Sequence, residues 1–424
     1  MNHETETFLK GYRVLDLTNE IGHLCGKILG DLGADVIKIE PPGGDAGRNN
    51  GPFYHDIPHP EKSLYWFYTN LNKRGITLNL ETDTGRDLFL QLAASADIVV
   101  ESFKPGYMES LHLAYPVLEK QNPGIILTSI TPFGQSGPYA DYRVTDLVGV
   151  AMGGMARLYG YMDSPPLRFS VPQFYFNGSL QGVLGTMVAL YHREMTGEGQ
   201  HVDVSCQQAV VLTLMMAAEI WDILKVNYRG IGPFGMSVRP TPPGPAIMRW
   251  VWPCKDGYVY LMVGGGSALG VRISTENLTT WANSEGYCLL LKDHDWAVDN
   301  TATVTQEEIN AMEEQFAEFL LTKTKKELFD YAVTHDIMLV PVTNAADLIA
   351  SPQLKARDFW REVEHPELGE KLTYPGWPIR WTDLPPYDPQ RRSPLIGEHN
   401  APIYEEELKL TREEMIILKN RGII

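Results

Sequence analysis

The chain has 424 residues, of which 44% are hydrophobic and 21% are charged, as is typical of a soluble globular protein. This length exceeds what one ordinary hydrophobic core organises, so we expect two domains, or a large domain with a smaller one. The formal charge of −17 at pH 7 argues against nucleic acid and anionic membranes as partners, but it leaves room for a small anionic ligand.

The cysteines and the amino-terminal residues indicate where such a protein works. The four cysteines lie far apart, form no CxxC pair and accompany no cluster of histidines, so we expect neither a disulfide framework nor a metal site. The start "MNHETETFLKGYRVLDL" has no signal-peptide pattern, and the longest apolar run, "AVVLTLMMAA", is too short to span a bilayer. These features predict a cytoplasmic protein.

The first third of the chain alternates predicted strands with predicted helices. The expected strands are "YRVLDLT", "DVIKIE", "GITLNL", "DIVVESF" and "GIILTSITPFG". The helices between them include "TDTGRDLFLQLAASA", for which Thr82 or Asp83 is the expected N-cap. Such alternation predicts an α/β fold with a parallel, doubly wound, Rossmann-like sheet. The segment "GHLCGKILG" lacks the GxGxxG spacing, so it gives little support to a dinucleotide site.

Helical patterns continue from 145 to about 225, and the character of the chain then changes. The stretch "NYRGIGPFGMSVRPTPPGPAIMRW" is dense in Gly and Pro and is typical of a linker, whereas "WPCKDGYVYLMVGGG" predicts a hairpin that opens a smaller unit. We assign a large domain to 1–225, a linker to 226–246, a small domain to 247–345, a second linker to 346–386 and a C-terminal return to the large domain to 387–424.

The stretch "SVPQFYFNGS", residues 170–179, places three consecutive aromatic residues before an Asn-Gly pair, at the start of a long helical run. Short polar residues, Asp among them, are the usual first residues of a helix because they accept hydrogen bonds from its free amides. An aromatic helix start without a carboxylate is therefore unusual.

Seven short motifs in order make the chain similar to a known family. They are "GYRVLDLT…GADVIKIEPPGGDAGRNNGPF", "NLNKRGITLNLET", "ADIVVESFKPG", "NPGIILTSITPFGQSGPYA", "REMTGEGQHVDVS", "CKDGYVYL" and "PLIGEHN". In this order they resemble the family III CoA-transferases, which include formyl-CoA and carnitine CoA-transferases, in a superfamily that also holds the α-methylacyl-CoA racemases. The resemblance implies a Rossmann-like large domain built from both chain ends and a small domain inserted between them. It also implies ring-shaped chains that interlock in a dimer.

The chemistry of that family implies a carboxylate nucleophile. An Asp attacks the acyl-CoA thioester to give a mixed anhydride, and the expelled thiolate then forms an aspartyl-CoA thioester. The resemblance places this Asp ten residues before Gly185, where this chain has Tyr175. A phenol has a pKa of about 10 and is mostly neutral at pH 7. We therefore expect that this chain does not form the covalent intermediate itself.

Four hypotheses follow. In the first, the chain is the Asp-lacking subunit of a heterodimeric member such as succinyl-CoA:benzylsuccinate CoA-transferase, and a homologous partner carries the Asp. The second is a homodimer that transfers CoA in a non-covalent ternary complex, and the third is a CoA-binding protein without turnover. The fourth, a racemase, is disfavoured because Thr145 stands where that branch has its His and Tyr175 where it has an acid.

Coenzyme A or an acyl-CoA is the expected substrate, with no tightly bound cofactor. By resemblance, the positions expected to contact it are Asn19, Glu20, Lys38, Ser102, Phe103, Lys104 and Arg143. Phe103 suits stacking on adenine, and Lys104 and Arg143 suit phosphate pairing. The run "VGGGS" at 263–267 is either a lid or oxyanion loop or a plain turn, and His399 is expected to make a structural hydrogen bond.

Overall fold

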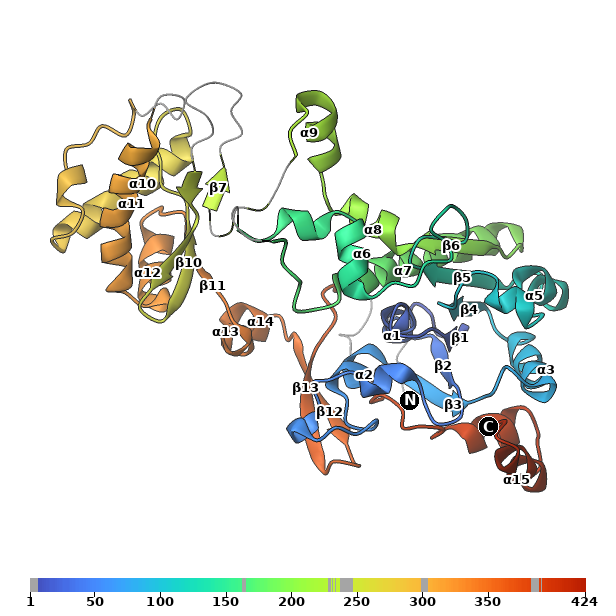
Figure 1. The fold of residues 1–424 in the computed structure, drawn as a ribbon. Coiled ribbons are helices and arrows are strands. Elements are labelled where there is room, and N and C mark those ends of the chain that lie inside the picture. Colours follow the sequence, from blue (N-terminus) through green and yellow to red (C-terminus); the bar gives the residue numbers. More distant parts are fainter. Residues whose placement is uncertain are drawn as a thin grey trace. The chain divides into compact units, whose positions relative to one another are not determined.

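The computed structural model describes residues 7–161, 165–227, 230, 232, 234–236, 247–298, 304–382, 389 and 391–424. The chain divides into two compact units (Figure 1). The larger unit comprises Met1–Ala156, Arg168–Val226 and Pro352–Ile424, and the smaller comprises Arg157–Leu167 and Asn227–Ser351. Each unit has its own hydrophobic core.

A six-stranded sheet forms the centre of the larger unit. Its strands, in spatial order, are β3 (Lys73–Thr77), β2 (Asp35–Glu40), β1 (Arg13–Leu17), β4 (Ile98–Glu101), β5 (Ile126–Thr131) and β6 (His201–Ser205). All neighbouring strands are parallel, with Val14 of β1 paired to Val36 of β2 and to Ile98 of β4. This order is that of a doubly wound sheet, which confirms the predicted fold class. The order reverses between β1 and β4, where ligands of such sheets usually bind.

Helices cover both faces of this sheet, because side chains of alternate strand residues point to opposite sides. One core contains Val14, Val36 and Ile98 and is completed by α1 (His23–Asp31), α7 (Gln173–Thr196) and α8 (Cys206–Leu212). The other core contains Leu15, Ile37 and Val99 and is completed by α3 (Asp83–Ala93), α4 (Tyr107–Ser110), α5 (Tyr115–Gln121) and α15 (Arg412–Asn420). The amide of Gly85 donates to Thr82 Oγ1 at 3.0 Å, which confirms Thr82 as the N-cap of α3.

The C-terminal segment packs beside β3, the edge strand of the sheet. The imidazole Nδ1 of His399 accepts from Gly75 N at 3.1 Å, and Asn400 Oδ1 accepts from Thr77 N at 2.9 Å. Just beyond, Tyr404 in η5 (Pro402–Glu407) donates to the carbonyl of Thr77. The interpretation of His399 as a structural group is therefore confirmed, and these bonds satisfy a strand edge that would otherwise be open.

Short elements and one hairpin complete the larger unit. These elements are η1 (Ala46–Asn49), η2 (Tyr54–Asp56), α2 (Leu64–Thr69), α6 (Asp146–Met152), α9 (Ala217–Leu224) and α14 (Pro352–Ala356), while η3 (Met155–Leu158) spans the boundary between the two units. The hairpin of β12 (Trp360–His365) and β13 (Glu370–Pro375) packs Val363 and Tyr374 against Trp66 and Phe67 of α2. It lies within 346–386, the range predicted as the second linker, whereas most of the first predicted linker, 226–246, falls outside the described residues.

The smaller unit is built on an antiparallel sheet of β9 (Val251–Cys254), β10 (Gly257–Leu261) and β11 (Leu339–Val342), in the order β11-β10-β9. The pair β9–β10 confirms the predicted hairpin. Its other elements are β7 (Phe234–Met236), β8 (Ile247–Arg249), α10 (Leu269–Ser284), η4 (Leu289–Leu291), α11 (Gln306–Leu321), α12 (Lys325–Thr334) and α13 (Ala345–Ala350). Trp252, Leu278 and Phe316 are central to its core.

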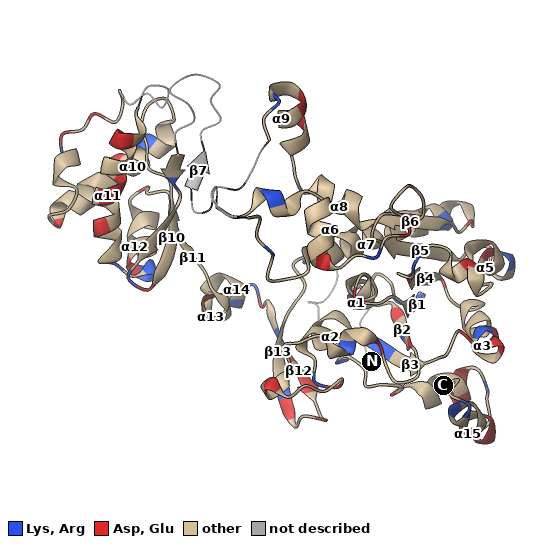
Figure 2. Cartoon of the chain, in the orientation of Figure 1, with Lys and Arg blue, Asp and Glu red and all other residues tan. Residues whose placement is uncertain are grey.

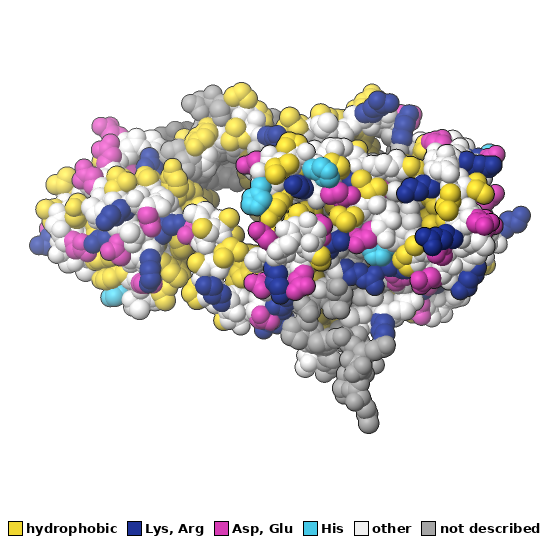
Figure 3. Space-filling model, turned by 90° about the horizontal axis from the view of Figure 1, so that it is seen from below, with side chains coloured by type: hydrophobic (Ala, Val, Ile, Leu, Met, Phe, Trp, Pro, Cys, Tyr) yellow, Lys and Arg dark blue, Asp and Glu magenta, His cyan; other side chains and the backbone are white. Residues whose placement is uncertain are grey.

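The charges are distributed over the whole chain. Figure 2 shows Asp and Glu on α11 in the smaller unit and on α15 in the larger. The face in Figure 3 carries basic side chains among acidic ones, with hydrophobic side chains between them. Among the described residues, no single helix is long and apolar enough to cross a membrane, and only α8 and α9 together, a pair bent by 71°, reach that length and composition.

Candidate active site

The loops that follow β1 and β4 meet where the order of the sheet reverses. The amide of Asn19 donates to Ser102 Oγ at 2.8 Å, and Ser102 Oγ also lies 3.0 Å from Asn19 Oδ1. These bonds fasten two of the expected CoA-contacting positions to each other. The residue after Asn19 is Glu20, whose side chain extends toward the helix start that carries Tyr175.

A pocket of about 520 Å³ lies beside these loops and is lined by residues of the larger unit alone, including Glu20, Asn50, Tyr65, Asp146, Arg168 and Tyr175. We call it the Tyr175 pocket. Its walls come from the turn after β1, the segment 49–51, α2, the start of α6, the segment 168–172 and the first turn of α7. Two carboxylates and two phenols thus share one pocket with a single guanidinium.

Tyr175, at the position where the resemblance places the nucleophile of the family, is 5% exposed. Its hydroxyl donates to Glu20 Oε1 at 3.4 Å. Burial raises the pKa of this phenol above its ordinary value, and the nearby carboxylates of Glu20 and Asp146 raise it further because they disfavour a second negative charge. At neutral pH Tyr175 is a hydrogen-bond donor rather than a nucleophilic anion.

Glu20 is held in place by three contacts around the pocket. Asn50 Nδ2 donates to Glu20 Oε2 at 2.7 Å, and Tyr175 donates to the other carboxylate oxygen. Tyr65 Oη donates to the backbone carbonyl of Glu20 at 3.1 Å. Both oxygens of this half-buried carboxylate therefore have a neutral donor.

The aromatic start of α7 is explained by Asp146. The N-cap residue, Pro172, makes no side-chain hydrogen bond to the first amides of this helix. Asp146 Oδ1 accepts one instead, from the amide of Phe174 at 2.8 Å. Burial raises the pKa of the Asp146 carboxyl, whereas this amide and the guanidinium of Arg168 counteract the rise. The carboxylate that stabilises this helix start thus comes from α6. Residues 174–176 therefore need not supply a capping side chain and can be aromatic.

The remaining positions expected to bind CoA have different surroundings. Lys38 is fully buried, its ammonium donates to the carbonyl of Thr18, and it lies 3.8 Å from Asp16 Oδ1 and 3.7 Å from Asp45 Oδ2. The ammonium of Lys38 therefore contacts buried groups of the larger unit. Ser102 is buried as well, and Phe103 is half-buried against Tyr107, with 4.8 Å between ring centroids.

Two basic positions do reach the surface near each other. Lys104 Nζ forms an ion pair with Asp141 Oδ1 at 3.0 Å, which brings the loop after β4 beside the segment that holds Arg143. Arg143 is exposed. The CoA-binding roles of these residues stay predictions.

Sequence reasoning did not find Asn50, Tyr65 or Arg168, which line the Tyr175 pocket from three separate segments. No local pattern marks them.

A second, small pocket of about 70 Å³ was missed too, at the ends of β4 and β5, where Ser129 Oγ lies 2.9 Å from His201 Nε2. The buried carboxyl of Glu101 lines it, and burial outweighs its bonds to Ser129 and Phe103 N and raises its pKa to about 7.

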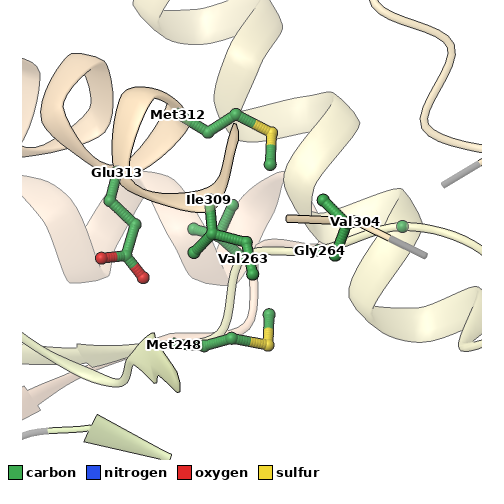
Figure 4. Close-up of a pocket in the computed structure, with 8 residues that line it drawn as sticks. Met248, Val263, Gly264, Val304, Ile309, Met312 and Glu313 are labelled. Carbon is green, nitrogen blue, oxygen red and sulfur yellow. The ribbon is translucent and has the colours of Figure 1, made fainter. Parts of the chain in front are cut away.

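The glycine run of the smaller unit lines a pocket of about 30 Å³. Figure 4 shows Met248, Val263, Ile309 and Met312 around it, with the carboxylate of Glu313 at one side. Two amides of the run are already used, since Gly264 N donates to Thr275 Oγ1 at 3.0 Å and Gly266 N to the carbonyl of Trp296 at 2.7 Å. These bonds favour a structural turn. Within the described ranges, no three His, Cys, Asp or Glu residues gather as metal ligands.

Comparisons with known proteins agree on one family. A family model described as CoA-transferase family III matches residues 9–400. The chain is 34% identical to subunit BbsE of succinyl-CoA:(R)-benzylsuccinate CoA-transferase from Thauera aromatica, over 93% of each chain. It is 32% identical to a formyl-CoA:oxalate CoA-transferase of Streptomyces avermitilis, over 98% of this chain and 99% of that protein.

Solved structures give the same result. A CAIB/BAIF family protein from Brucella suis superposes with a TM-score of 0.79 at 29% identity, covering 94% of this chain and 99% of that one. Rv3272 from M. tuberculosis superposes with a TM-score of 0.72 at 26% identity, covering 94% and 99%. The match over nearly the whole chain, on a doubly wound sheet, shows that this protein belongs to CoA-transferase family III, whose members use CoA thioesters as substrates.

Proposed function

We propose that this chain is the subunit without a nucleophile in a heterodimeric CoA-transferase. The enzyme exchanges CoA between an acyl-CoA thioester and a carboxylic acid, and a homologous partner supplies the catalytic Asp. The chain contributes its fold and contacts to the pair rather than a covalent intermediate. The interlocked arrangement that the resemblance implies stays a prediction.

The observation that carries this proposal is the phenol of Tyr175 at the nucleophile position. A carboxylate is ionised at neutral pH, attacks a thioester and later leaves as an acyl group when the second acid arrives. The phenol of Tyr175 is kept neutral by burial and by two neighbouring carboxylates. An ester formed through it would also turn over slowly, so a second chain must provide the carboxylate.

Exposed apolar side chains on α7 and α8 favour a partner. Leu184 and Val188 on α7 are 57% and 61% exposed, and Leu212 at the end of α8 is 70% exposed. An apolar groove of about 970 Å³ runs along α7, where Leu184 and Met187 line it opposite the indole rings of Trp377 and Trp381. Contiguous apolar surface of this extent is unusual on a monomer and common where subunits meet.

The substrates we propose follow the relative with two unlike subunits. That relative is named as transferring CoA from succinyl-CoA to (R)-benzylsuccinate. We therefore propose a short dicarboxylic acyl-CoA as donor and an aromatic carboxylic acid as acceptor. The rings of Tyr175 and Tyr65 line the Tyr175 pocket, where they suit an aromatic acceptor, whereas Phe174 is buried and Phe176 lines a different groove.

The test is co-expression of this chain with a homologue that carries Asp at the nucleophile position, followed by native mass measurement and a CoA-transfer assay with succinyl-CoA. We expect a one-to-one complex that transfers CoA, loss of transfer when the partner's Asp is replaced by Ala, and no transfer by this chain alone. Transfer by this chain in the absence of any partner would contradict the proposal. So would a complex that stays active without the partner's Asp.

A further inference from the structure

We propose that Glu101, Ser129 and His201 form a pH-sensitive switch, in which a proton bound by Glu101 reverses both hydrogen bonds of Ser129 and weakens the bond that holds the loop after β4. This inference goes beyond the proposed function and does not depend on it. The loop includes residues 102–104, which are three of the positions expected to contact CoA. The switch thus connects the ionisation of one buried carboxyl to a candidate ligand-binding loop.

The three side chains come from three neighbouring strands. Glu101 ends β4 and is the register partner of Ser129 on β5, so both side chains point to the same face of the sheet. Ser129 Oγ bonds to the Glu101 carboxyl and lies 2.9 Å from Nε2 of His201, the first residue of β6. Glu101 and Ser129 are buried, whereas His201 is exposed, so the imidazole links the buried pair to solvent.

A serine hydroxyl has one proton, so Ser129 can donate to Glu101 or to His201 but not to both. When Glu101 is ionised, Ser129 donates to the carboxylate, and Nε2 of the neutral imidazole donates its proton to Ser129 Oγ. When Glu101 is protonated, it donates to Ser129, and the hydroxyl turns to Nε2, so the imidazole proton resides on Nδ1. Each protonation state of Glu101 therefore goes with one tautomer of His201.

The change between the two states takes up one proton. A proton from solvent binds Nδ1 of the imidazole, Nε2 passes its own proton to Ser129 Oγ, and the hydroxyl proton of Ser129 moves to the Glu101 carboxylate. The imidazole is neutral before and after. The charge that disappears is that of the carboxylate.

The same proton weakens the hold of Glu101 on the loop. Glu101 Oε2 accepts from the amide of Phe103 at 2.6 Å, and an ionised carboxylate makes such a bond roughly twice as strong as a neutral acceptor does. The residue between them, Ser102, is fastened separately by the amide of Asn19 at 2.8 Å. We therefore expect protonation to loosen the loop from Phe103 onward.

Both titrations lie where the switch requires them. Burial raises the pKa of Glu101 to about 7, so the carboxyl changes its charge near neutral pH. Burial also lowers the pKa of His201 below 6.5, so the imidazole is neutral while Glu101 titrates. The tautomer is therefore free to follow the carboxyl.

The other titratable groups around the carboxyl support this balance. Glu109 from α4 and Asp203 from β6 add negative charge and raise the pKa of Glu101 beyond the effect of burial. Tyr115 from α5 is neutral, since its own pKa is raised to about 12. Lys104, on the loop itself, is largely exposed and pairs with Asp141 at 3.0 Å. Solvent and this partner weaken its effect on the buried carboxyl.

The experiment follows the imidazole and the loop by NMR from pH 6 to pH 8 in the full chain, labelled with ¹⁵N at histidine and phenylalanine. Imidazole spectra distinguish the two tautomers, and His201→Gln and Phe103→Leu identify the two signals. The forms compared are the wild type, Ser129→Ala, Glu101→Gln and Glu109→Gln. Thermal unfolding checks that each form is folded.

In the wild type we expect His201 to carry its proton on Nε2 at pH 8 and on Nδ1 at pH 6, with the ratio changing about tenfold per pH unit. The amide proton of Phe103 should move upfield with the same midpoint as pH falls. In Glu101→Gln the proton should stay on Nδ1 throughout, because the Gln oxygen faces the Phe103 amide and its NH₂ group donates to Ser129.

The other two variants separate the bonds from the charges. In Ser129→Ala the Phe103 signal should still titrate while the His201 tautomer no longer follows it. In Glu109→Gln both signals should change together at a lower midpoint, because a negative charge that raises the pKa of Glu101 is gone.

Three results would overturn the inference. They are a single His201 tautomer from pH 6 to pH 8 in the wild type, clearly different midpoints for His201 and Phe103, and a tautomer change that persists in Ser129→Ala. If Ser129→Ala does not fold, Glu101→Gln decides, since a pH-dependent tautomer in that variant contradicts the switch. The proposed function is tested separately, by the dependence of CoA transfer on a partner.

Discussion

Asp16 and Glu20 lie on the same short stretch of chain, yet their carboxylates have opposite surroundings. Asp16 is fully buried, with Lys73 Nζ at 2.7 Å and Lys38 Nζ at 3.8 Å. Burial alone would raise its pKa, but the two ammonium groups outweigh that effect and lower it to about 2. Glu20 has no such cation among the described residues and instead accepts from an amide and a phenol.

Asp16 therefore belongs to the structural core, and Glu20 belongs to the pocket. Beside Asp16, the ammonium of Lys73 also donates to Asn70 Oδ1 and to the carbonyl of His23, so all three ammonium protons of Lys73 are used. A closed network of this kind fixes β1 and β3 in the sheet and leaves no group for a ligand. In the Tyr175 pocket, the carboxylates of Glu20 and Asp146 face open volume, and Arg168 is the one basic side chain among the described lining residues. Such an excess of acidic groups is typical of functional sites rather than of structural ion pairs.

The largest effect is expected for Asp16→Asn. It leaves the buried ammonium of Lys73 without its carboxylate and that of Lys38 with Asp45 alone, and we expect the free energy of unfolding to fall by about 3–5 kcal/mol. Chemical denaturation at pH 7 measures this loss. The matched control is Asp141→Asn, which removes the partner of Lys104 at the surface and should cost less than about 1 kcal/mol. Equal losses in the two variants would show that the Asp16 network is not structural.

A third carboxyl, Glu101, differs from both: no ion pair forms with it among the described residues, and burial raises its pKa from 4.5 to about 7. Between these two pH values the folded protein binds more protons at this carboxyl than the unfolded chain does. Its contribution to stability is therefore present at low pH and is lost as pH rises, by about 3 kcal/mol in all.

Glu101→Gln should flatten this dependence and raise the free energy of unfolding at pH 8 by roughly 1–3 kcal/mol relative to the wild type. Denaturation curves at several pH values between 4.5 and 8 measure the effect. Glu314→Gln, which removes an exposed carboxylate from α11 in the smaller unit, is the control and should leave the slope nearly unchanged. A wild-type stability that rises over this range would contradict the assignment.

The smallest expected effect is that of Tyr175→Phe. It removes one long hydrogen bond to Glu20, so the free energy of unfolding should change by less than about 1 kcal/mol. In the complex with an Asp-bearing partner, CoA transfer should continue at nearly the wild-type rate, because the phenol does no covalent work. Tyr65→Phe, which removes the shorter bond to the carbonyl of Glu20, is the matched comparison. A large loss of transfer in Tyr175→Phe alone would give the phenol a chemical role.

Much of the fold follows from local pattern. Alternation of strands and helices indicates the parallel sheet, and Thr82 is recognisable as a cap from the residues around it. Other elements were less accessible. The short strand β6 (His201–Ser205) is not among the expected strands, and β3 begins at Lys73, two residues before the predicted strand. Pairing to a neighbouring strand decides such boundaries, and single-sequence pattern does not contain it.

The candidate site was only partly readable. The family resemblance places Tyr175 at a fixed distance from Gly185, and it also marks Asn19 and Ser102, which the structure joins by a hydrogen bond. Asp146 as the cap of α7, and Asn50 as the partner of Glu20, come from segments that carry no sign of these contacts. Lys38 is fully buried, which no pattern of neighbouring residues indicates.

The fold class, the family motifs and the lack of a carboxylate at position 175 can be read from the sequence, because each depends on residues close together along the chain. The sequence does not reveal that Glu20, 155 residues away, faces Tyr175, or that Lys73 pairs with Asp16 while Lys38 lies between Asp16 and Asp45. The physical reason is that strand order and helix packing bring distant side chains to hydrogen-bond distance. The ionisation state of each carboxylate is then set by which neighbours arrive there.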